Sequence, residues 1–145
     1  MDLLDILSVS ASGLTAQRVR MQSVASNMAN ARVTRTPDGG PYVRQMPVFE
    51  AVPHGGRGAT FASALDENMS RVEVVGIEAS DEPPVLVYEP GHPDANADGY
   101  VLYPNVNILK EMVDMMTTAR TYEANTNVVK VTRDIANSAL SIGRS

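Results

Sequence analysis

The chain has 145 residues, no cysteine and a net charge of −5. The absence of cysteine excludes a disulfide framework and a thiolate metal site. Residues 45–99 carry ten acidic residues and two arginines, whereas residues 1–44 and 100–145 are close to neutral. This argues against nucleic-acid binding, which requires a concentrated basic surface.

Helix breakers divide the chain into three segments. All nine prolines lie within residues 37–104, and eight of the ten glycines lie within residues 39–99. Because glycine and proline interrupt regular structure, we expect one helical segment over 1–31, a β-containing middle over 32–104 and a second helical segment over 105–145.

The first segment is typical of a helix over about residues 3–31. Its apolar residues recur at the alternating three- and four-residue spacing of a heptad seam: Leu4, Leu7, Ala11, Leu14, Met21, Ala25 and Met28. Arg18 is the one break in this seam, and Gly13 lies inside the helix. Such a helix depends on packing for its stability.

The middle segment contains four short β-rich runs, at residues 42–52, 71–79, 84–89 and 99–104. The Met46-Pro47 pair predicts an edge strand or a bend, because proline cannot donate to a sheet ladder. The "HGGRGAT" run that begins at residue 54 predicts a flexible loop.

The turn between the last two runs resembles a calcium loop. Its "DANADG" stretch has oxygen-bearing side chains and a glycine at the positions where the first half of a calcium-binding loop has them. The closing position is Asn105 instead of glutamate, and two prolines stand where the incoming helix would be. A polar turn with its carboxylates toward water is the simpler interpretation, and a calcium-binding module using the Asp94–Asp98 loop is the alternative function.

The second helix is expected over about residues 105–142, with Asn105 or Asn107 as its cap and Glu111 in its early, dipole-favoured turns. It carries two apolar seams. The first contains Ile108, Met112, Met115, Ala119, Tyr122, Thr126 and Val129, and the second contains Val128, Val131, Ile135, Ala139 and Ile142. Two long helices cannot bury all these seams against each other, so the leftover face needs a partner from another molecule.

The sequence therefore predicts an α+β fold, with long terminal helices packed as a coiled-coil-like pair and a small, irregular β-rich middle of hairpins. It contains no Ser/His/acid set, no phosphate loop and no metalloprotease motif. We expect no catalytic activity, no cofactor and no bound metal. We also expect no membrane-spanning segment and no cleaved signal peptide, since Asp2 and Asp5 replace a basic start.

Three stretches resemble one known family. They are "ASNMANARVTRTPDGGPYVRQMPVF", "VYEPGHPDANADGYVLYPNVNILKEMVDMM" and "ARTYEANTNVVKVTRDIANSAL". Together they cover most of the chain and are similar to flagellar rod proteins of the FlgC type. The "NMAN" run is shared more widely, by flagellar rod and hook axial proteins, and the stretch over 89–101 is the more specific one.

This resemblance implies a structural subunit of the proximal rod in the flagellar basal body. Such subunits leave the cytoplasm through the flagellar type III apparatus without a cleaved signal and assemble helically in the periplasm. The implied neighbours are the FlgB, FlgF and FlgG rod proteins, the adaptor FliE and the ring protein FliF. A secreted needle subunit is a weaker alternative, because needle subunits lack a β-rich middle.

For this function we expect the assembly contacts to lie on the two helices, at Leu4, Leu7, Leu14, Met21, Met28, Ile108, Met112, Met115, Tyr122, Val129 and Ile135. Leu7, Leu14, Met21 and Met28 should face the C-terminal helix of the same or an adjacent subunit. Asn27 and Asn30 either end the first helix or hydrogen-bond neighbouring helices. Four arginines are either solvated or paired with acids across subunits: Arg18, Arg20, Arg120 and Arg133.

Overall fold

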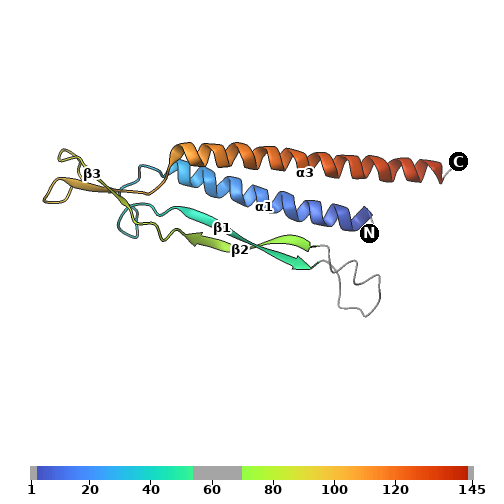
Figure 1. Ribbon diagram of the computed structural model, residues 1–145, viewed down its shortest axis with the longest axis horizontal. Helices are drawn as coiled ribbons and strands as arrows, with labels where there is room; N and C mark the ends of the chain where they lie inside the picture. The colour runs from blue at the N-terminus through green and yellow to red at the C-terminus, as the bar shows by residue number, and fades with distance from the viewer. Residues whose placement is uncertain (1–2, 54–69, 144–145) are drawn as a thin grey trace. The chain divides into compact units, whose positions relative to one another are not determined.

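The computed structural model describes residues 3–53 and 70–143. Its elements, in chain order, are α1 (Leu3–Ala29), β1 (Gln45–Pro53), β2 (Ser70–Ala79), β3 (Val85–Tyr88), β4 (Tyr100–Tyr103) and α3 (Ile108–Ile142) (Figure 1). The α+β fold with long terminal helices and two small hairpins confirms the sequence prediction. The loop expected at residues 54–60 lies outside the described residues.

Local polar contacts set the ends of both helices. Asn107 Oδ1 accepts a hydrogen bond from the backbone N–H of Lys110 at 3.1 Å, which makes Asn107 the N-cap of α3. The last residue of α1 is followed by Asn30, whose side-chain amide donates to the carbonyl of Ser26 at 2.9 Å. The expected starting and stopping signals therefore act at Asn107 and Asn30.

The strands form two separate two-stranded sheets, β1 with β2 and β3 with β4. In the second sheet the strands are antiparallel, and Leu86 pairs with Leu102 while Tyr88 pairs with Tyr100. The turn between them closes at Gly99, which has a φ of 82°, a conformation that other residues rarely adopt.

The first sheet places Pro47 where it does not interrupt pairing. The N–H of Ser80 bonds the carbonyl of Arg44 at 2.8 Å, so the backbone groups of Gln45 and Pro47 point away from β2. Gln45 bonds the Asn27 side chain on that side, and the missing donor of Pro47 removes no hydrogen bond between the two strands. Of the two expected outcomes at Pro47, the edge strand is the one observed.

The described residues divide into two compact units. Unit 1 contains the described parts of 1–19, 48–76 and 118–145, and unit 2 contains 20–47 and 77–117. Few apolar side chains are buried in the described ranges: Ala16 in unit 1, and Val24, Ala31 and Val101 in unit 2. Small residues dominate this set, so neither unit has a large hydrophobic core.

Candidate functional site

The centre of unit 2 is a polar junction built on Asn27, whose side chain is 1% exposed. Its amide oxygen accepts hydrogen bonds from the N–H of Gln45 at 2.8 Å and the hydroxyl of Tyr42 at 3.0 Å. Its amide nitrogen donates to the carbonyl of Gln45 at 2.9 Å and to Glu111 Oε2 at 3.2 Å. The Asn27 amide thus makes the two hydrogen bonds to Gln45 that a neighbouring strand would make, and it also bonds Glu111 on α3.

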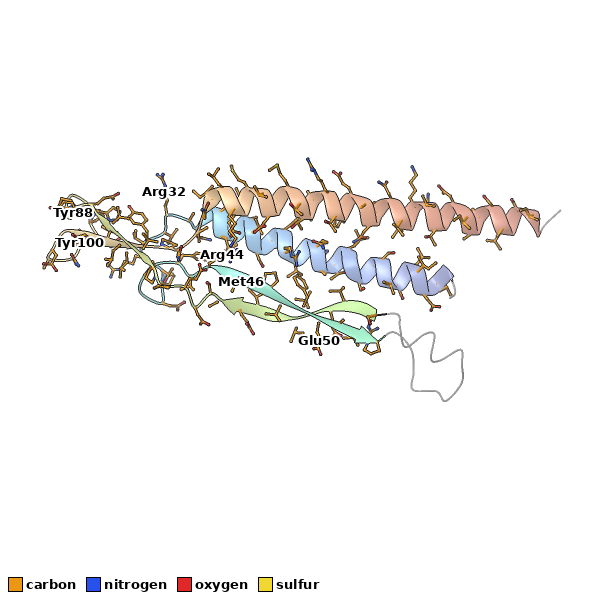
Figure 2. All side chains as sticks on the ribbon, viewed as in Figure 1. Arg32, Arg44, Met46, Glu50, Tyr88 and Tyr100 are labelled. Atoms are coloured by element: carbon orange, nitrogen blue, oxygen red, sulfur yellow. The ribbon has the colours of Figure 1, made fainter. Side chains whose placement is uncertain are left out.

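Glu111 is the second member of this junction and is completely buried. Its other carboxylate oxygen accepts a hydrogen bond from Arg44 Nε at 2.7 Å, and the Arg44 side chain is only 16% exposed. Arg44 is labelled in Figure 2. A buried carboxylate is costly unless it is paired and hydrogen-bonded. Here both oxygens have partners, from two different parts of unit 2.

This geometry corrects two sequence expectations. Asn27 does not end α1, because it lies inside the helix and bonds β1 and α3 of its own chain, whereas Asn30 does act at the helix end. Glu111 is more than a favourable acid near a helix start, because it is the acceptor for Arg44. The junction therefore fixes the last turns of α1 and the first turn of α3 against β1 within unit 2.

In unit 1 the two helices meet through small and polar residues. A methyl group added at Gly13 would lie 3.0 Å from Asn125 Nδ2, so glycine permits the close approach of α1 to α3. Among the described residues of this part of the helix pair, Ala16, Thr118 and Thr132 are buried. The Ser12 hydroxyl also accepts a hydrogen bond from the N–H of Val72 on β2 at 3.2 Å. The buried helix positions of unit 1 are therefore small or polar.

Most large apolar side chains of α3 are exposed in both units. In unit 2 these are Ile108, Leu109, Met112, Val113 and Met116, and in unit 1 they are Tyr122, Val128, Val131, Ile135, Leu140 and Ile142. At about 100° per residue, Val128, Val131, Ile135 and Ile142 share one face of the helix. We call these four residues the α3 stripe; they are 45%, 56%, 54% and 75% exposed, respectively.

None of the residues expected to make assembly contacts is fully buried in the chain, and all of them are described. Leu4, Ile108, Met112, Tyr122 and Ile135 are exposed. Leu7, Leu14, Met21, Met28, Met115 and Val129 are half-buried. Leu14 directly follows Gly13, and Met28 directly follows Asn27. Each therefore lies about 100° around α1 from a residue that contacts another part of its unit. Their partners in an assembly stay a prediction, as do the ion pairs across subunits.

The turn that resembles a calcium loop uses its oxygens internally. Asp94 Oδ2 accepts a hydrogen bond from the Thr34 hydroxyl at 2.8 Å, so this carboxylate does not simply face water as expected. Asn96 Oδ1 accepts from the N–H groups of Asp98 and Tyr100 at 3.0 and 2.9 Å, which is the geometry of a tight polar turn. This arrangement does not favour the calcium alternative.

The same hairpin contains a perturbed tyrosine. The Tyr103 hydroxyl donates a hydrogen bond to Glu89 Oε2 at 2.9 Å. This bond to the carboxylate, and then slight desolvation, raises the pKa of Tyr103 above its ordinary value.

Among the described residues there is no group of three or more His, Asp or Glu placed to hold a metal ion. None of the described helices is long and apolar enough to cross a membrane.

Comparison with known proteins identifies the relatives of this chain. The family described as "Flagellar basal body rod FlgEFG protein C-terminal" matches residues 97–142, which include β4 and all of α3. The chain is 40% identical to the flagellar basal-body rod protein FlgC of Borreliella burgdorferi, with 98% of both chains covered. It is 44% identical to FlgC of Bacillus subtilis, with 95% of this chain and 96% of the relative covered.

A third relative extends the likeness to the whole length. The chain is 38% identical to FlgC of Escherichia coli O157:H7, with 99% of this chain and 100% of the relative covered. Each of these relatives is named a flagellar basal-body rod protein, and the matches include both terminal helices and the middle. The chain belongs to the flagellar basal-body rod protein FlgC family.

Proposed function

We propose that this chain is a structural subunit of the flagellar basal-body rod and that it assembles helically through its terminal helices. In this proposal residues 1–31 and 105–145 are the assembly segments, and residues 32–104 form the β-containing middle. The assembled helices enclose the export channel and transmit torque. No catalytic activity or cofactor is part of this role. Family membership supports the role as a rod subunit, and the exposed apolar surface of α3 supports assembly through the terminal helices.

The observation that carries this proposal is the exposed α3 stripe. Full burial of a valine or isoleucine side chain contributes roughly 1.5–3 kcal/mol. The four side chains are about half exposed or more, so a neighbour that covers them would gain about 1 kcal/mol from each. A contact of this strength is weak for one pair and becomes decisive when it repeats along an assembly.

The same proposal places the chain in the proximal rod, in the periplasm. Its neighbours there are the FlgB, FlgF and FlgG rod proteins, the adaptor FliE and the ring protein FliF. Export through the flagellar type III apparatus requires a chain that unfolds readily. The small core of each unit supports this route, because few buried apolar contacts oppose unfolding.

The test replaces Ile135 with serine in cells whose own copy of the gene is deleted. Ile135→Ser removes apolar surface from the α3 stripe, whereas the control Asn137→Ser changes an exposed residue about 200° further around α3. We expect Ile135→Ser to be exported but depleted from purified basal bodies, and Asn137→Ser to be incorporated normally. Equal incorporation of both variants would count against assembly through this face.

A further inference from the structure

The hairpin of unit 2 has a second unpartnered apolar surface. Alternation along β3 and β4 places Leu86, Tyr88, Tyr100 and Leu102 on one face of the hairpin, opposite the fully buried Val101. We call these four residues the hairpin face; they are 62%, 63%, 43% and 44% exposed, respectively. Tyr88 and Tyr100 are labelled on the hairpin in Figure 2, and their rings make an edge contact with centroids 5.3 Å apart.

A groove runs along this face. Its lining includes Leu86, Tyr100 and Leu102 on the hairpin side and Arg35 and Pro41 on the side of the preceding loop. The groove is open, with apolar side chains of the hairpin on one wall, and its lining also includes the polar side chains of Thr34, Asp94 and Asn96. Grooves of this kind receive the apolar side of an amphipathic helix.

Charge decides which partner suits the groove. Residues 77–99 contain six acidic residues and no lysine or arginine. Three of the acids belong to the hairpin turn: Glu89, Asp94 and Asp98. Two hairpins placed face to face would bring these acids together, and like charges oppose such a contact. The partner must carry an apolar face without an acidic excess.

The second half of α3 meets this requirement. Residues 118–142 carry three basic residues and two acidic ones, and Arg120 lies close to the line of the α3 stripe. We propose that the groove beside the hairpin face of one copy receives the α3 stripe of a second copy, a contact that rests on the proposed function and names its partner surface. Because the two surfaces differ, the contact is head-to-tail, the kind of contact that an open helical assembly requires.

The test uses the absence of native cysteine, which makes every introduced thiol unique. The full-length double variant Leu102→Cys/Val131→Cys is expressed in flagellated cells and treated with a short bismaleimide. We expect a ladder of dimers and higher multimers on a denaturing gel, because each copy would join one neighbour through each thiol. A second double variant, Leu86→Cys/Val131→Cys, repeats the test in case the Leu102 substitution disturbs the hairpin.

Three controls define what overturns the proposal. Leu102→Cys alone should give almost no dimer, and a strong dimer would indicate hairpins packed face to face. Leu102→Cys/Asn137→Cys should give at least several-fold less multimer, because Asn137 lies away from the stripe. If variants are present in purified basal bodies but no ladder forms with either pair, the docking contact is wrong while the rod function stands. If the wild-type chain is absent from purified basal bodies, the proposed function itself fails.

Discussion

The polar junction of unit 2 makes a sharp prediction about Asn27. Asn27→Ala removes four hydrogen bonds at once, to Tyr42, to both backbone groups of Gln45 and to Glu111. Asn30→Ala is the matched control, because it changes the same residue type three positions later. The Asn30 side chain bonds only within its own turn, to Ser26.

The magnitude follows from what each truncation leaves behind. Net hydrogen bonds contribute about 0.5–1.5 kcal/mol, and those to a charged group about 1.5–3 kcal/mol. Tyr42 keeps its contact with Ser26 Oγ at 3.2 Å, and alanine regains roughly 0.5 kcal/mol of helix propensity. We therefore expect Asn27→Ala to lower the free energy of unfolding by roughly 2–4 kcal/mol, and Asn30→Ala by about 0.5 kcal/mol.

Two measurements check this prediction. Urea unfolding followed by far-ultraviolet circular dichroism reports the change in stability, and hydrogen exchange of the Gln45 amide reports the local bond. Protection of this amide should fall in Asn27→Ala and persist in Asn30→Ala. If the two variants lose equal stability and Gln45 stays protected in both, Asn27 does not hold the junction as described.

Three more outcomes follow from the geometry. Glu111→Ala leaves a largely buried guanidinium unpaired and should cost roughly 3–5 kcal/mol in urea unfolding; a loss below about 1 kcal/mol would contradict a buried pair. Gly99→Ala should cost about 1–3 kcal/mol, because φ is 82° and the new methyl would lie 2.9 Å from a tyrosine ring, whereas Gly91→Ala meets no atom within 4 Å and should be close to neutral. Tyr103 should titrate at a higher pH in the folded than in the unfolded chain, so its contribution to stability is present below pH 10.0 and lost as pH rises through the raised pKa. Glu89→Gln should lower that pKa toward its ordinary value; carbon NMR of the tyrosine rings measures it, and an unchanged pKa would refute the role of the carboxylate.

The secondary structure was largely predictable from local signals. The helices observed at Leu3–Ala29 and Ile108–Ile142 agree with the expected spans to within a few residues. Proline and glycine placement marked their ends, and Asn107 gave the expected cap. These features depend on neighbours in sequence, so the sequence contains them directly.

The buried side of α1 was not predictable in the same way. Apolar spacing pointed to the seam through Leu7, Leu14, Met21 and Met28, whereas the buried side of α1 carries Ala16, Ser23, Val24 and Asn27. Small residues allow close approach but give no hydrophobic signal. The clue was present in Gly13, which is unfavourable within a helix unless a neighbour needs the space.

The polar junction was missed for a related reason. Arg44 and Glu111 are 67 residues apart, and no local pattern links them. Arg44 alone is compatible with a solvated charge, and Glu111 alone is compatible with an acid near a helix start. Only the fold brings Asn27, Arg44 and Glu111 together, and only their burial shows that they depend on one another.

The central claim is that α3 presents more apolar surface than one chain covers. Maleimide labelling of the single variant Ile135→Cys tests it most directly, in the purified chain, in isolated basal bodies, and in basal bodies dissolved in denaturant as the measure of total thiol. The account predicts rapid labelling of the free chain, strong protection in intact basal bodies and full labelling after dissolution. Equally rapid labelling in the free chain and in intact basal bodies would contradict it.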